Sequence, residues 1–152
     1  MAGREKIAID ASVALKWYVE EKWTSQARGI IDDYQKGRID IASVSLMPYE
    51  VLNALRYVSD ISIIDLQTVA KSIEKLSLDL YHLEGELSEM TIENALRYGI
   101  TVYDSSYLSL GEIEENNVYT ADEKLLNKTK NTCLKPISSY TQQKNDTANK
   151  TL

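Results

Sequence analysis

The chain opens with a short apolar run that stops abruptly on a carboxylate. Residues 7–9 form this run, and Asp10 follows it directly. From Ala11 to Val19 the apolar residues recur with the period of a helix. The pattern predicts a buried strand, a tight turn and a helix, with Asp10 at the carboxyl end of the strand, where ligands bind in open α/β sheets. Asp is also a preferred N-cap, so the alternative is that Asp10 only caps the following helix.

Composition narrows the class of protein. The 152 residues with 43% hydrophobic content suit one globular domain with its own core. The net charge of −6 excludes the strongly basic surface that is typical of nucleic-acid binders, although the segment from Glu123 onward holds six Lys against two acids. An acidic body can still bind a polyanion if a divalent cation supplies positive charge at the contact.

The cellular compartment is predicted from what the sequence lacks. Cys133 is the single cysteine, so no intrachain disulfide can form and a reducing interior is expected. Neither a signal peptide nor an apolar stretch of about 18 residues is visible. We therefore expect a cytoplasmic protein with no membrane association.

Strand and helix patterns alternate along the rest of the chain. Helices are predicted over 24–36, 65–77, 86–98, 105–110 and 123–130, with a further one beginning near Pro48, and strands over 39–44, 100–103, 118–120 and 132–135. Residues 78–83 fit either a short strand or an extended connector. Thr120 and Glu123 have the spacing of a capping box. We predict an α/β domain over residues 1–137 with a mainly parallel sheet covered on both faces, followed by a polar, disordered tail over 138–152.

Acidic residues follow three of these predicted strands. Asp10, Asp104 and Asp122 each come at or just after a strand's end, and parallel strands have their carboxyl ends at one edge of the sheet. Glu50 lies in the first turn of its predicted helix, three residues before Asn53. It is the natural fourth member of this predicted group of acids. The alternative for each acid is structural, as a helix cap or as a first-turn acid favoured by the helix dipole.

Four carboxylates in one crevice need a counter-charge. Two unit charges ~4 Å apart repel by roughly 4 kcal/mol at an intermediate dielectric. Mg²⁺ or Mn²⁺ prefers oxygen ligands, and His82 and Cys133 are isolated, which argues against zinc. Such a site suits hydrolysis of a phosphodiester by a metal-activated water. Ser12, Asn53 and Thr120 lie within reach by sequence and could orient ligands or waters.

Four stretches that contain these acids resemble the signatures of the PIN-domain family, in the order and at the spacings usual in that family. They are Ile-Asp10-Ala-Ser12-Val-Ala-Leu-Lys-Trp, Pro48-Tyr-Glu50-Val-Leu-Asn53-Ala-Leu, Tyr103-Asp104-Ser-Ser-Tyr107-Leu and Tyr119-Thr120-Ala-Asp122-Glu-Lys-Leu. The resemblance covers about residues 6–136 and is greatest to the VapC-type toxins of toxin–antitoxin pairs.

The resemblance implies a PIN-like three-layer α/β/α sandwich with the activity of a Mg²⁺- or Mn²⁺-dependent endoribonuclease. Its metal-binding quartet would be Asp10, Glu50, Asp104 and Asp122. The auxiliary polar positions of the family match Ser12, Asn53 and Thr120. It also implies a homodimer and a small cognate antitoxin that blocks the acidic groove. Apolar residues of the helices over 24–36 and 65–77 could form the dimer contact.

Two other functions are consistent with parts of the pattern. A phosphatase of the haloacid-dehalogenase type also begins with a strand and an Asp, but it needs a second acid two residues later, where this chain has Ser12. The other alternative is not an enzyme of another kind but a binding protein: a catalytically weak module of the same fold that binds RNA or a protein.

Overall fold

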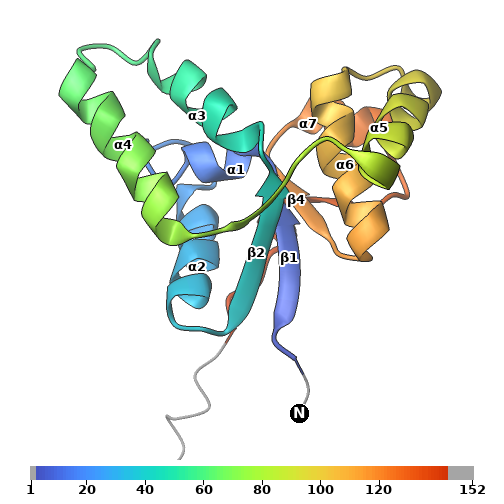
Figure 1. The fold of residues 1–152 in the computed structure, drawn as a ribbon. Coiled ribbons are helices and arrows are strands. Elements are labelled where there is room, and N and C mark those ends of the chain that lie inside the picture. The colour runs from blue at the N-terminus through green and yellow to red at the C-terminus, as the bar shows by residue number, and fades with distance from the viewer. Residues whose placement is uncertain (1–2, 144–152) are drawn as a thin grey trace, which may run out of the picture.

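The computed structural model describes residues 3–143 and contains a five-stranded, entirely parallel sheet (Figure 1). The strands are β1 (Glu5–Ile9), β2 (Ile39–Val44), β3 (Asp79–Tyr81), β4 (Val118–Thr120) and β5 (Leu134–Pro136). They lie in the order β3-β2-β1-β4-β5, so β1 is central. Ala8 is in register with Ala42 of β2 and with Val118 of β4. The predicted α/β architecture is confirmed, and 78–83 contains a short edge strand.

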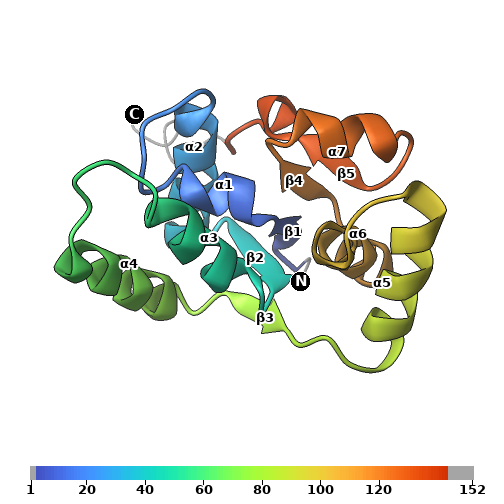
Figure 2. The ribbon, with the colours of Figure 1, turned by 90° about the horizontal axis from the view of Figure 1, so that it is seen from above.

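Helices cover both faces of the sheet and form the outer layers of a three-layer sandwich. They are α1 (Ala11–Leu15), α2 (Thr24–Gln35), α3 (Met47–Leu55), α4 (Ile63–Leu76), α5 (Gly85–Tyr98), α6 (Val102–Glu114) and α7 (Glu123–Lys128), with a 3-10 turn η1 (Ile137–Ser139). Helices α1 and α2 lie on one side of the sheet and α5 and α6 on the other (Figures 1 and 2). Within residues 3–143, no helix has the length and apolar character needed to cross a membrane.

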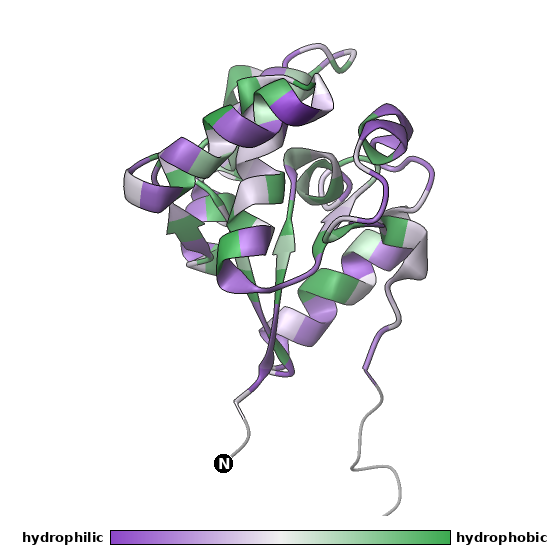
Figure 3. Cartoon of the chain, turned by 90° about the vertical axis from the view of Figure 1, so that its right-hand side faces the viewer, coloured by the Kyte–Doolittle hydropathy of each residue, from purple (hydrophilic) through white to green (hydrophobic). Residues whose placement is uncertain are grey.

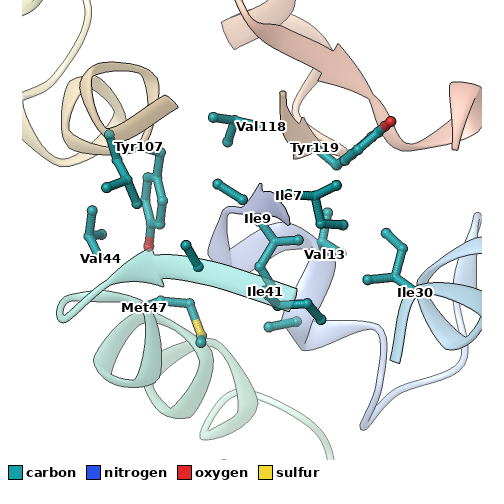
Figure 4. Close-up of a cluster of buried hydrophobic side chains, with 14 of the residues drawn as sticks. Ile7, Ile9, Val13, Ile30, Ile41, Val44, Met47, Tyr107, Val118 and Tyr119 are labelled. Carbon is teal, nitrogen blue, oxygen red and sulfur yellow. The ribbon is translucent and has the colours of Figure 1, made fainter. Parts of the chain in front are cut away.

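The core lies between the sheet and these helices. The strands β1 and β2 at the centre of the sheet are mostly hydrophobic, apart from the first residues of β1, whereas the helices alternate between hydrophobic and hydrophilic segments (Figure 3). Ile9, Ile41 and Val118 are almost fully buried, and Tyr107 of α6 reaches over the sheet toward α3 (Figure 4). Helix α6 approaches β4 closely at Gly111, because a Cβ there would lie 2.3 Å from Val118 Cγ2. The parallel sheet is therefore buried on both faces, as its nearly continuous apolar strands require.

The prediction of a strand over 100–103 is wrong. Gly99 ends α5 with a positive φ of 62°, and α6 already begins at Val102. The Thr101 side chain caps α6 by accepting a hydrogen bond from the Asp104 amide at 3.0 Å. The β-branched residues that suggested a strand therefore serve as a helix cap and first turn, and Asp104 lies at the start of a helix.

Two further local predictions need correction. The predicted capping box of Thr120 and Glu123 does not form, because the Asp122 side chain caps α7 by accepting a hydrogen bond from the Leu125 amide. The Thr120 hydroxyl instead donates to Asp10. Helix α1 ends at Leu15 rather than near Val19, so the first helix is shorter than its apolar pattern predicts.

The chain beyond Pro136 continues the fold further than predicted. Tyr140 stacks edge-on against Tyr119, with ring centroids 5.3 Å apart. Its hydroxyl donates to the Asp33 carboxylate of α2, which also accepts the Gln143 amide. Residues 138–143 therefore belong to the packed domain. The remainder of the predicted tail, 144–152, lies outside the described residues.

Candidate active site

Asp10 follows β1 and caps α1, so its side chain lies at the carboxyl edge of the sheet. Its Oδ1 accepts hydrogen bonds from the Ser12 hydroxyl at 2.5 Å and from the Val13 amide at 3.3 Å. Its Oδ2 accepts one from the Thr120 hydroxyl at 2.5 Å. Asp10 therefore caps the helix and lies at the sheet edge at the same time. These contacts occupy both lone-pair sites of Oδ1 and one of Oδ2, which keeps one free.

The two hydroxyls that hold Asp10 are themselves fixed by the loop after β4. Ser12 Oγ accepts a hydrogen bond from the Ala121 amide at 2.8 Å, and Thr120 Oγ1 accepts one from the Asp122 amide at 3.1 Å. Each hydroxyl therefore accepts a hydrogen bond from a backbone amide and donates its single proton to Asp10. This network joins two segments about 110 positions apart in the sequence and orients the carboxylate.

Burial makes the charge of Asp10 unfavourable. The residue is only 5% exposed, and its desolvation raises its pKa to about 6. The hydrogen bonds from Ser12, Thr120 and Val13 lower the pKa in part, whereas the nearby charge of Asp104 raises it. A cation in the crevice would remove this penalty.

Asp104 and Asp122 lie on the side of the crevice formed by α6 and α7. Both line a cavity of about 360 Å³ together with Thr101, Lys124 and Lys128. Burial and the charge of Asp122 raise the pKa of Asp104, while the hydrogen bond to Thr101 and the charge of Lys128 lower it. The two carboxylates therefore interact across this cavity.

Glu50 lies in the first turn of α3, on the opposite side from α7, and is held by a buried tyrosine. Tyr107 of α6 donates its hydroxyl to Glu50 Oε1 at 2.5 Å and is 2% exposed. Burial raises the pKa of Glu50, the hydrogen bond from Tyr107 lowers it, and the charge of Asp104 raises it. The contact links α3 to α6 across the end of the sheet.

The four predicted acids interact in pairs through Asp104 rather than as one cluster. The charge of Asp104 raises the pKa of both Asp10 and Glu50, and the charge of Asp122 raises that of Asp104. Asn53 differs from the other predicted polar residues because its side chain is exposed and makes no hydrogen bond to the residues that the structure describes.

The donor set fits a hard divalent ion, although the carboxylates are not drawn together around a single point. Among residues 3–143, no three Asp, Glu, His or Cys side chains are close enough to hold an ion at once. Mg²⁺ commonly keeps several waters and binds through one or two carboxylates. The all-oxygen donor set suits Mg²⁺ or Mn²⁺, and burial, with a smaller contribution from neighbouring carboxylates, raises the pKa values of Asp10, Glu50 and Asp104, a penalty that a cation would offset.

Sequence reasoning assigned no role to Tyr107, Thr101 or Lys128, all of which contact or border the acids. Tyr107 follows Asp104 by three residues, and this helical spacing places both on one face of α6. That spacing could have indicated Tyr107 once α6 was known to begin at Val102. Lys128 could not have been found in this way, because only the packing of α7 brings it to Gly99, whose carbonyl lies 3.4 Å from Lys128 Nζ.

Comparisons with known proteins agree with this fold. Over 128 residues the chain is 27% identical to Ribonuclease VapC3 of Pyrobaculum aerophilum, covering 81% of this chain and 94% of that protein. The crystal structure of PAE2754 from Pyrobaculum aerophilum superposes with a TM-score of 0.60 at 24% identity, covering 91% and 94% of the two chains. A toxin–antitoxin complex from Klebsiella pneumoniae gives a TM-score of 0.61 at 11% identity, covering 86% and 97%. No family model matches the sequence.

The parallel sheet, the two helical layers and the acids at the carboxyl edge define a PIN-like α/β/α fold. The resemblance of the chain to VapC-type PIN-domain proteins is likewise confirmed, because the sequence relative is a VapC ribonuclease that is covered over nearly its whole length.

Proposed function

We propose that the protein is a Mg²⁺- or Mn²⁺-dependent endoribonuclease and the toxin of a toxin–antitoxin pair. The observation that supports the proposal is the electrostatic interaction of Asp104 with Asp10, Glu50 and Asp122, together with the cavity that Asp104 and Asp122 line. The similarity to Ribonuclease VapC3 supports the activity. The toxin–antitoxin complexes among the structural neighbours support a small antitoxin as the partner.

The proposed division of roles follows from the contacts of each acid. Asp10 and Asp104 would hold the ion, and Asp122 and Glu50 would complete its shell directly or through water. A bound divalent ion supplies an activated water and stabilises the leaving oxygen of the phosphodiester. Ser12 and Thr120 keep Asp10 oriented, and Tyr107 keeps Glu50 oriented. Asn53 would act only if RNA or water bridges it to the crevice.

The proposal is tested by RNA cleavage and by metal-dependent stability measured on the same sample. We expect cleavage of single-stranded RNA with Mg²⁺ or Mn²⁺ and none with EDTA. Thermal unfolding should shift upward with Mg²⁺, because a ligand that binds only the folded state stabilises it by about 2.7 kcal/mol at 100 times its Kd. Equal cleavage in EDTA, or an unfolding temperature that does not change when Mg²⁺ is added, would contradict the metal assignment.

Lys124 and Lys128 provide positive charge beside the acids and should contact the RNA backbone. Both line the cavity that contains Asp104 and Asp122. We expect Lys128→Gln and Lys124→Gln each to reduce the salt dependence of RNA binding by about 0.7 in the slope of log K against log salt, the value for one phosphate contact on a single strand. Lys71→Gln, on the exposed face of α4, is the control. An unchanged slope in both cavity variants would exclude these lysines from the interface.

A second candidate function follows from the separation of the carboxylates. Because no three of the described acids already surround one point, the protein could bind RNA or its partner with little turnover. Metal-dependent retention of RNA without cleavage would favour this binding module over the nuclease.

A homodimer remains a prediction, and the structure changes where its contact would lie. Ala27 and Ile30 of α2 are fully buried in the core, so α2 does not offer the expected apolar patch. Ile63 and Ile64 at the start of α4 are more than 70% exposed and provide the better surface. Sedimentation that finds only species of about 17 kDa would exclude the dimer.

A further inference from the structure

An apolar pocket lies beside Asp104, because Tyr103 and Ser106 of the same helix line it. It lies where the ends of β2 and β3 meet the first turns of α3 and α6, and its volume is about 270 Å³. Tyrosine and aliphatic side chains form most of its wall. The lining residues that matter here are Tyr49, Leu83, Val102, Tyr103, Ser45 and Ser106.

Two of these tyrosines directly precede predicted catalytic acids. Tyr49 comes before Glu50 on α3, and Tyr103 comes before Asp104 on α6. Helices α3 and α6 therefore each contribute one residue to the pocket and one predicted catalytic acid. A group bound in the pocket and a phosphate held at the acids could belong to neighbouring positions of one RNA strand.

Two of the three tyrosines that line the pocket make no hydrogen bond within the fold, whereas the third, Tyr81, bonds to Lys6 and Asp79. Tyr49 is 75% exposed and Tyr103 is 61% exposed, and neither hydroxyl forms a hydrogen bond with the residues that the structure describes. Leu83 and Val102 beside them are also exposed, at 55% and 47%. A contiguous exposed apolar surface of this kind is typical of a binding site.

We propose that this pocket binds an unpaired base of the RNA, next to the phosphate that the acids would cleave. This inference rests on the proposed ribonuclease function. Single-stranded RNA is recognised chiefly by bases that stack on aromatic side chains. The pocket combines two exposed tyrosine rings with the Ser45 hydroxyl and with Ser106 Oγ, which donates to the Tyr103 carbonyl and can still accept a hydrogen bond from a base edge.

Size and surroundings favour a base over an apolar peptide segment. The volume of about 270 Å³ lies below the ~300–1,000 Å³ of pockets that hold drug-sized ligands, so it suits one ring system rather than the face of a helix. Asp104 itself lines a second cavity together with Lys124 and Lys128, whose charges suit a phosphate. Base-binding and phosphate-binding surfaces thus both adjoin Asp104, as a nucleotide strand requires.

The test uses Tyr49→Ala and Tyr103→Ala with Tyr57→Ala as a matched control. Tyr57 is also 75% exposed but is not part of the pocket lining. Because stacking is worth about 1–3 kcal/mol per base, each pocket variant should weaken binding of short single-stranded RNA by about 5- to 150-fold. In cleavage assays, each pocket variant should show a higher KM, with a smaller change in kcat. Tyr49→Phe and Tyr103→Phe should retain near-normal affinity, since the ring is kept.

A series of RNA oligonucleotides, each with one abasic position, locates the base. One abasic position should weaken binding of the unmodified protein as much as Tyr49→Ala does, and the two changes together should add little. If the unmodified protein cleaves RNA but both Ala variants keep its KM and its cleavage positions, the base pocket is wrong and the nuclease stands. Ala variants that lose only self-association or antitoxin binding also overturn it. A protein that neither binds nor cleaves RNA overturns both proposals.

Discussion

Asp104→Asn is expected to reduce RNA cleavage by at least about 10²-fold, the loss seen when one group that stabilises a transition state is removed. The reason is the central position of Asp104, whose charge acts on both Asp10 and Glu50 while it shares a cavity with Asp122. An amide at this position cannot supply the negative charge that an ion needs. Rates measured at saturating Mg²⁺ with single-stranded RNA provide the comparison.

The same substitution should make the protein more stable without metal. Burial and the charge of Asp122 both disfavour the ionised Asp104 carboxylate, so a neutral amide at pH 7.5 relieves repulsion. Thermal unfolding in EDTA should show a higher midpoint than the unmodified protein, and Mg²⁺ should raise it less. Loss of activity together with higher stability would separate a functional role from a structural one.

Asp65→Asn is the matched control for Asp104→Asn. Asp65 occupies the same third position of its helix, and its amide is likewise bonded to the hydroxyl of the capping residue, Ser62. It lies on α4, away from the crevice, so cleavage should be unchanged. An Asp104→Asn protein with full activity would refute the site, as would equal losses in both variants.

Asp33→Asn is expected to lower the free energy of unfolding by about 3–5 kcal/mol, because breaking a buried ion pair leaves its partner's charge uncompensated. The Asp33 side chain is fully buried and pairs with Arg38 at 3.0 Å. It also accepts hydrogen bonds from the Tyr140 hydroxyl and the Gln143 amide. The substitution therefore loosens both α2 and residues 138–143, and urea unfolding measures the difference.

The pH dependence of this effect has a defined sign. Desolvation raises the pKa of Asp33, but the hydrogen bonds from Tyr140, Gln143 and Arg38 outweigh it and lower the pKa below its ordinary 3.8. A carboxyl with a lowered pKa stabilises the fold above its ordinary pKa, and this contribution is lost as the pH falls through the lowered value. The difference between the two proteins should thus be full near neutral pH and shrink below about pH 3.8.

Asp32→Asn provides the neighbouring control. Asp32 is 38% exposed and pairs with Lys36 on the helix surface, where such pairs contribute about 0–1 kcal/mol. Its substitution should change stability little at any pH. If Asp32→Asn and Asp33→Asn behave alike, residues 138–143 are not held by a buried charge cluster.

Sequence alone determined the parts of this protein that depend on neighbouring residues. The β1–Asp10–α1 unit, the Ser62 and Asp65 capping box and the stop of α5 at Gly99 follow from interactions within a few positions of the chain. The four acids were also identified from local motifs. Asp10 and Asp122 follow parallel strands as predicted, whereas Asp104 lies at the start of a helix, and the convergence of all four acids on one metal site stays a prediction.

Only the tertiary structure decided which polar groups bond to one another. Thr120 was predicted to cap its own helix, yet its hydroxyl bonds to Asp10 because β4 lies beside β1 in the sheet. Tyr107 reaches Glu50 only because α6 packs across the sheet toward α3. A hydroxyl or carboxyl has several local partners of similar energy, and the choice among them depends on groups that the fold brings close from distant sequence positions. Periodicity and spacing cannot contain that information.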